Sequence, residues 1–258
     1  MKIDIKQTLA KTVSFYKTNF RRLAVISFAK VLYVVLMQII TWIPMLLGNN
    51  AILLVVAEDH AMQAMMQGVL AGVLSLVLLV TVIMFIPGIY LSMPVTINAL
   101  LAGEGLSFRE TYRRTKYKRE RYWGSMLLMA LWYIPLLVLQ QNVPFVSQLS
   151  VVYTAFITTI YYTLLPMIAI EPPAKHYLRR SAKMIKGNYL AALTLTLVTV
   201  TTLSVFNGVF TNMLYGNSMG QIVAGVMYVV ALFFVQPFND IAAVIVYKQL
   251  VTENQITV

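Results

Sequence analysis

Residues 7–47 read QTLAKTVSFYKTNFRRLAVISFAKVLYVVLMQIITWIPMLL, and this stretch decides the fold class. Its first part, up to Arg22, carries lysine and arginine at short intervals, whereas Leu23–Leu47 has a single charged residue, Lys30. An apolar stretch of about 20 residues has the length that a helix needs to cross the hydrocarbon core of a bilayer. The sequence here predicts a basic surface segment followed by a membrane-spanning helix.

The rest of the chain repeats this order. Among its 258 residues, 59% are hydrophobic and 11% are charged, and the mean hydropathy of +0.76 lies outside the range of soluble domains. The stretches long enough to span a membrane are Leu23–Leu47, Val69–Met93, Trp123–Val143, Phe145–Ile170, Tyr189–Phe210 and Gln221–Tyr247. The sequence therefore predicts an all-α, polytopic integral membrane bundle of about six transmembrane helices.

The basic residues give the expected orientation. Of the 20 Lys and Arg residues, six precede residue 23, seven lie from Arg109 to Arg121 and five lie from Lys175 to Lys186. Lysine and arginine beside a span are retained on the cytoplasmic face during insertion. We therefore expect a multi-pass protein of the cell (inner, cytoplasmic) membrane with both termini in the cytoplasm. The first apolar stretch is too long for a cleaved signal and is expected to stay as an anchor.

The three basic segments resemble one another. Residues 7–20 and 176–189 align without gaps, and residues 110–123 fit more loosely. The aligned pairs are Leu9/Leu178, Lys11/Arg180, Thr12/Ser181, Lys17/Lys186, Asn19/Asn188 and Phe20/Tyr189, and the looser copy adds Arg114, Thr115 and Trp123. Each segment precedes two apolar stretches, and the second of every pair carries proline. The pattern predicts a single domain, 1–258, of three repeats at about 4–101, 104–170 and 171–248. Such repeats often enclose a shared cavity on their axis, and the alternative is a bundle packed without one.

Each basic segment is expected to form an amphipathic helix on the membrane surface. In the first, five apolar residues fall on one arc of a helix and the lysines fall outside it. These apolar residues are Ile5, Leu9, Val13, Tyr16 and Phe20. Asp4 with Gln7, and Ser107 with Glu110, have the spacing of a capping box at a helix start.

Two ionisable residues lie inside expected spans. Lys30 and Asp240 are each seven residues from the cytoplasmic end of their span, so they are at a similar depth. An ionisable group there costs about 2.5–3.5 kcal/mol on insertion, so such groups pair or line a polar cavity. A Lys30–Asp240 pair would join the first and last helices. The alternatives are that Lys30 extends to the headgroups while Asp240 bonds locally, or that the two form a proton or ion site.

The basic segments form a candidate surface for lipid or for a partner protein. Each Lys or Arg near anionic headgroups contributes roughly 1 kcal/mol. The residues expected there are Lys11, Lys17, Arg21, Arg22, Arg113, Arg114, Arg119, Arg121, Arg179, Arg180, Lys183 and Lys186. Because these residues adjoin apolar spans, anionic lipid of the inner leaflet is a nearer partner than nucleic acid, and we expect no nucleic acid.

Patterns of catalysis and of cofactor binding are missing from the sequence. It has no HExxH, no GxSxG, no Walker loop and no Rossmann glycine fingerprint. It has no cysteine, which removes thiolate chemistry. His60 with Met62, Met65 and Met66 could suit Cu(I), but methionines at this spacing are more often the apolar face of an interfacial helix. We expect no enzyme activity, no cofactor and no metal.

Several stretches carry a recognisable pattern: the surface helix that ends in an Asn-aromatic step, Leu165-Pro166 through Glu171, and the Pro237 to Lys248 stretch. Leu178-Arg179-Arg180-Ser181 and Lys186-Gly187-Asn188-Tyr189 belong to it as well. At these residues the chain resembles the membrane domain found in some bacterial glycerophosphoryl diester phosphodiesterases. Stand-alone six-span bacterial membrane proteins of this type are similar over nearly the whole length.

This resemblance implies a bacterial inner-membrane domain and no phosphodiesterase activity. Those enzymes catalyse on a separate barrel with histidine and acidic metal ligands, and this chain has only His60 and His176. Two functions fit the sequence. One is a non-catalytic accessory or scaffold subunit that binds anionic lipid and a protein partner, or a second copy, through its basic face. The other is a small transporter or channel for a lipid, peptide or other small molecule along the repeat axis.

Overall fold

A computed structural model of the chain describes residues 3–56, 61–132, 134, 146–172, 176–198 and 218–256. Every regular element in these residues is helical, as the sequence predicts. The elements are α1 (Ile5–Val56), α2 (Ala61–Leu101), α3 (Phe108–Lys116), α4 (Arg119–Leu131), α6 (Val146–Ile160), α7 (Leu164–Ile170), α8 (Tyr177–Ile185), the 3-10 helix η1 (Lys186–Asn188) and α10 (Ser218–Ile256). Residues 189–198 are helical as well.

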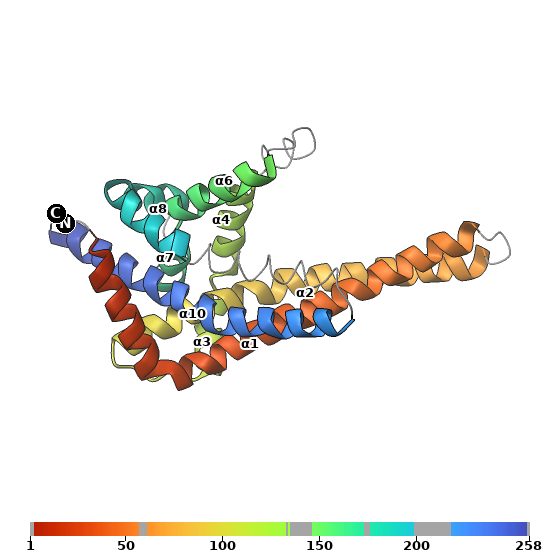
Figure 1. Cartoon of the computed structure of the whole chain (residues 1–258), viewed down its shortest axis with the longest axis horizontal. Coiled ribbons are helices and arrows are strands. Elements are labelled where there is room, and N and C mark those ends of the chain that lie inside the picture. Colours follow the sequence, from red (N-terminus) through yellow and green to blue (C-terminus); the bar gives the residue numbers. More distant parts are fainter. Residues whose placement is uncertain are drawn as a thin grey trace.

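The long helices form one layer of the molecule. Figure 1 shows α1 and α2 side by side as an extended pair, with α10 running along them. The shorter helices α4, α6, α7 and α8 lie together on one side of this layer (Figure 1). The two ends of the chain lie together, and near them the backbone N–H of Ile3 donates to Oδ1 of Asn188 at 2.8 Å.

The buried core lies around the C-terminal parts of α2 and α10. One cluster joins Leu23 and Ile26 of α1 to Met93 of α2 and Val244 of α10. A second cluster packs the short helix α7 against α2, α8 and the end of α10, with Tyr177 and Tyr247 among its buried residues. The core therefore forms where the expected surface segments meet the expected spans.

The first expected surface segment and the first expected span lie on one continuous helix. The helix α1 runs without interruption through 52 residues, about 78 Å at 1.5 Å per residue. Figure 1 shows that it bends and then turns to run beside α2. The junction at Arg21, Arg22 and Leu23 has neither proline nor glycine, so nothing in its sequence interrupts the backbone hydrogen bonds.

Both expected helix caps are confirmed. Oδ1 of Asp4 accepts the backbone N–H of Gln7 at 3.0 Å, and Oγ of Ser107 accepts that of Glu110 at 3.3 Å. These side chains satisfy N–H groups that the first turn of a helix leaves without a partner.

Only part of the expected six-span pattern falls on described residues. By length and composition, one stretch of the described chain, Met84–Leu101, could cross a membrane, and Met65–Leu78 and Ala155–Ile170 are shorter apolar helical stretches. A turn at residues 161–163 separates α6 from α7. The third and fifth expected spans run into residues 135–145 and 199–210, which lie outside the described residues. The architecture is thus all-helical, and the number of spans stays a prediction.

The three surface helices bury hydroxyl residues at equivalent positions of the repeat. Thr12, Thr115 and Ser181 align in the repeats, and each is fully buried. Oγ1 of Thr115 lies 3.3 Å from the carbonyl oxygen of Gly88 in α2. Oγ of Ser181 lies 3.0 Å from Oγ1 of Thr163, between α6 and α7.

Each surface helix packs on helices of the preceding repeat, and the first surface helix contacts the third repeat. The helix of the second repeat, α3, packs on α2 of the first, and α8 of the third repeat packs on α6 and α7 of the second. The start of α1, in the first repeat, contacts α10 of the third repeat, where Oγ1 of Thr8 lies 3.5 Å from Oε1 of Gln249. The three contacts therefore form a closed cycle. The apolar arc of the first helix faces outward in part, since Val13 and Phe20 are 40% and 38% exposed.

Candidate functional site

The structure brings Lys30 and Asp240 together. Nζ of Lys30, from α1, lies 2.7 Å from Oδ2 of Asp240, from α10, and the two side chains are only 5% and 11% exposed. The Lys30 ammonium therefore points into the protein and does not extend to the surface. A charge-assisted hydrogen bond of this length, formed away from water, compensates the removal of both charges from solvent.

Polar groups surround this ion pair. The Lys30 ammonium also lies 5.4 Å from the ring centroid of Tyr90, within cation–π range. The Tyr162 hydroxyl interacts electrostatically with Asp240, and Ser27 lies one turn before Lys30 in α1. The hydroxyls of Ser27, Tyr33 and Tyr162 are buried and have no hydrogen-bond partner in the described part of the chain. Sequence reasoning missed Tyr90 and Tyr162, because no short-range pattern links them to residues 30 and 240.

Most of the residues expected on the basic face are exposed. In the described residues ten of the twelve are exposed, namely Lys11, Lys17, Arg21, Arg22, Arg113, Arg114, Arg179, Arg180, Lys183 and Lys186, and Arg119 and Arg121 are half-buried. Arg119 turns toward the protein, where its Nη2 lies 3.3 Å from the hydroxyl of Tyr112. The guanidinium of Arg119 is thus partly engaged in a hydrogen bond within the protein.

Two of the exposed arginines already have carboxylate partners. Arg114 lies 3.5 Å from Glu104. Arg180 binds Glu171 through both Nη atoms, at 2.6 and 3.1 Å. Glu171 also accepts the hydroxyl of Tyr247 at 2.9 Å, which ties the third surface helix to α10. The sequence did not single out Glu171 for this role.

Lys118 occupies a half-buried position between the second surface helix and α7. Its ammonium donates to the backbone carbonyl of Ala169. Burial, and secondarily the charge of Arg121, lowers the pKa of Lys118 below its ordinary value of 10.5. This lysine serves as an internal contact and is not part of the free basic surface.

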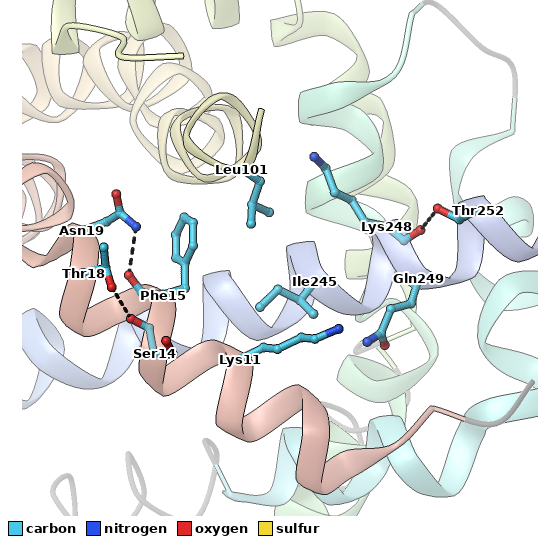
Figure 2. Close-up of a pocket in the computed structure, with 10 residues that line it drawn as sticks. All are labelled: Lys11, Ser14, Phe15, Thr18, Asn19, Leu101, Ile245, Lys248, Gln249 and Thr252. Atoms are coloured by element: carbon cyan, nitrogen blue, oxygen red, sulfur yellow. Dashed lines mark hydrogen bonds between the residues drawn. The ribbon is translucent and has the colours of Figure 1, made fainter. Parts of the chain in front are cut away.

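A cavity of about 730 Å³ opens where the start of α1 meets the ends of α2 and α10. The residues that line it are Lys11, Ser14, Phe15, Thr18, Asn19, Leu101, Ile245, Lys248, Gln249 and Thr252. Figure 2 shows Lys11 reaching across from α1 toward Gln249, while Lys248 points toward Leu101 at the end of α2. Burial lowers the pKa of Lys248 below 10.5. Among the side chains that the structure describes, no carboxylate lines this cavity.

The methionines of the possible copper cluster, Met62, Met65 and Met66, are exposed at the start of α2. His60 lies outside the described residues. Within the ranges that the structure describes, no three His, Cys, Asp or Glu side chains come close enough to hold a metal ion.

No protein-family model, curated protein or solved structure matches this chain. The resemblance to the membrane domain of glycerophosphoryl diester phosphodiesterases therefore stays a proposal.

Proposed function

We propose that the chain is a non-catalytic, polytopic protein of the bacterial inner membrane. In this proposal it is an accessory subunit whose basic cytoplasmic face binds anionic lipid and a partner protein. The observation that carries the proposal is the distribution of exposed side chains, which are apolar along the long helices and basic where the surface helices join them.

The exposed apolar side chains are most regular on α2. They are Met62, Met65, Met66, Val69, Leu70, Val73, Leu76, Val77, Val80, Met84 and Phe85. At 1.5 Å per residue this segment covers about 35 Å, close to the roughly 30 Å hydrocarbon core of a bilayer. Soluble monomers rarely expose contiguous apolar patches larger than a few hundred Å². Lipid is the surrounding that suits this surface.

Similar exposed apolar residues occur on other helices, both long and short. They are Val25, Phe28 and Leu32 on α1, Leu127, Leu128 and Leu131 on α4, Val152 and Phe156 on α6, and Val226, Val230 and Phe234 on α10. Together with the apolar stretches of the sequence, they favour six spans, both termini in the cytoplasm and the surface helices in the headgroup layer. Each exposed Lys or Arg there would gain roughly 1 kcal/mol from anionic lipid.

Single cysteines test the orientation, because the natural chain has none. Met62→Cys and Tyr117→Cys place a thiol at positions that are 79% and 80% exposed, on opposite sides of the proposed membrane. In intact cells, a membrane-impermeant maleimide should label Met62→Cys and should label Tyr117→Cys only after permeabilisation. Labelling of both from the outside, or of neither, would show the proposed topology to be wrong.

Native mass spectrometry tests the lipid and partner roles. The protein is extracted gently and titrated with phosphatidylglycerol or phosphatidylcholine, and we expect the anionic lipid to bind more tightly. A variant with Lys17, Arg21, Arg113 and Lys183 changed to Gln should lose this preference. Extraction from the host membrane should also retain a stoichiometric protein partner. Equal binding of the two lipids, or a chain recovered without a partner, would contradict the respective part of the proposal.

A transport function is the second candidate, and the surroundings of Lys30 and Asp240 favour it. A buried ion pair beside hydroxyls without partners has the polarity of a site on a transport path. Proteoliposomes containing a fluorescent phospholipid distinguish the two functions. Transport predicts movement of the lipid between leaflets that Asp240→Asn abolishes without loss of folded protein. An accessory subunit predicts no movement above that of protein-free vesicles.

A further inference from the structure

Lys11, one of the two lysines of the cavity, differs from its repeat equivalents in one respect. Lys11 aligns with Arg114 and Arg180, and each of these arginines has a carboxylate partner, Glu104 or Glu171. Among the described residues neither the Lys11 ammonium nor the Lys248 ammonium has a hydrogen bond or ion pair, and no described carboxylate lines the cavity. The cavity thus places a second ammonium group, that of Lys248, near Lys11, where the second and third repeats supply their own anion.

Most of the other polar groups of the cavity already have hydrogen-bond partners within the protein. Thr18 and Asn19 bind backbone carbonyls of their own helix at 3.0 and 3.1 Å, and Thr252 binds the carbonyl of Lys248 at 2.9 Å. Oε1 of Gln249 lies 3.5 Å from the Thr8 hydroxyl. The charge that the cavity offers to a ligand is therefore that of Lys11 and Lys248.

The cavity also has an apolar wall and the volume of a ligand site. Phe15, Leu101 and Ile245 come from three different helices and line it together (Figure 2). Its volume of about 730 Å³ falls within the roughly 300–1,000 Å³ of known small-molecule sites. Lys248 directly follows the expected end of the last span, so the cavity lies at the depth of the lipid headgroups.

We propose that this cavity binds one anionic phospholipid, whose phosphodiester pairs with Lys11 and Lys248 and whose first acyl carbons lie on Phe15, Leu101 and Ile245. The proposal rests on the proposed function and names one specific site within the basic face. An anion from outside would complete in the first repeat the charge pairing that Glu104 and Glu171 complete in the other two.

Native mass spectrometry with dihexanoylphosphatidylglycerol tests the site. The wild type should retain one lipid under activation that removes the others, and Lys11→Gln with Lys248→Gln should weaken this binding about tenfold or more. The control Lys6→Gln with Lys116→Gln removes the same charge from exposed positions outside the cavity and outside the basic face, and it should keep the retained lipid. Glycerol 3-phosphate should not compete, because it lacks acyl carbons. Competition by it would mean a free-phosphate site and would overturn the proposal.

A second pair of variants keeps both lysines. Ser14→Glu introduces a carboxylate one turn from Lys11 in the cavity wall, and it should expel the lipid by supplying an internal partner. Ser14→Gln has nearly the same shape without the charge and should retain the lipid. Melting temperatures check that all variants fold. If the wild type prefers phosphatidylglycerol to phosphatidylcholine but retains no single lipid, this site is disproved while the proposed function stands. If the wild type shows no preference for phosphatidylglycerol, the proposed function is disproved.

Discussion

Nζ of Lys30 lies 2.7 Å from Oδ2 of Asp240, although 210 positions separate the two residues in the chain. The contact joins the first described helix, α1, to the last, α10. Ile26 lies one turn before Lys30 and Ile241 directly follows Asp240, and both belong to a buried apolar cluster with Met93 of α2. Removing one partner would leave a charge in this surrounding without compensation.

The first prediction concerns this pair. Lys30→Met and Asp240→Asn should each destabilise the protein, by up to about 3–5 kcal/mol, because each leaves a buried group without its partner. The double variant should lose less than the sum, with a coupling of about 0.5–3 kcal/mol. Unfolding in mixed micelles of detergent and denaturant measures all three free energies.

Lys17→Met is the control for this cycle. Lys17 lies on the same helix, is exposed and has no ion pair among the described residues. Its substitution should change the free energy of unfolding by no more than about 0.5 kcal/mol. Simple additivity of the Lys30 and Asp240 losses would show that the contact contributes nothing specific.

The second prediction concerns the hydroxyls under the surface helices. Thr115→Val keeps the shape of the side chain but removes a hydroxyl that lies 2.8 Å from the Tyr112 carbonyl oxygen of its own helix and 3.3 Å from the Gly88 carbonyl oxygen of α2. It should cost about 1–2 kcal/mol, because the site is fully buried. Thr194→Val removes an exposed hydroxyl that bonds only within its own helix, to Leu190 at 2.9 Å, and should change stability by less than about 0.5 kcal/mol. Equal losses in the two variants would contradict a role in helix packing.

The sequence predicted features that depend on composition or on local spacing. It predicted helices throughout and the caps at Asp4 and Ser107. It offered the Lys30–Asp240 pair as one of three alternatives, because a charge inside a span restricts its neighbours strongly. It did not predict the continuity of α1, since a basic surface segment and an apolar span can share one helix when no residue breaks the backbone. Nor did it predict Tyr90 beside Lys30, because contacts between distant segments depend on how the helices pack.

The repeat alignment contained more than the sequence reasoning used. The equivalence of Thr12, Thr115 and Ser181 was visible, but on a surface helix a hydroxyl more often faces water than protein. The prediction for the first surface helix was based instead on its apolar arc, which includes Val13 and Phe20. A helix that lies between protein and lipid can turn its apolar arc outward. Small hydroxyl residues that recur at one repeat position therefore indicate better which side of the helix packs on the protein.

The third prediction concerns the close approach of α3 to α2. A Cβ added at Gly88 would overlap the ring of Tyr112, whereas one added at Gly124 in α4 has nothing within 4 Å. Gly88→Ala should therefore cost about 1–3 kcal/mol through overpacking. Gly124→Ala, the matched control, should be neutral or stabilise by about 0.5–1 kcal/mol, because alanine favours helix. Tyr112→Leu should reduce the cost of Gly88→Ala, and an unchanged cost would mean that the ring is not the obstacle.

The last prediction concerns pH and Lys118. Since burial and Arg121 lower the pKa of Lys118 in the folded protein, the unfolded chain binds this proton more tightly. At pH values between the lowered pKa and 10.5, Lys118 is therefore protonated in a larger fraction of unfolded than of folded molecules. The contribution of this site to the free energy of unfolding thus rises with pH. Below the lowered pKa both states are protonated and the contribution is constant. The melting temperature of the wild type minus that of Lys118→Gln should therefore increase as the pH is raised toward 10.5. A falling difference for Lys118→Gln would mean that the folded protein holds the ammonium form more tightly than the unfolded chain does.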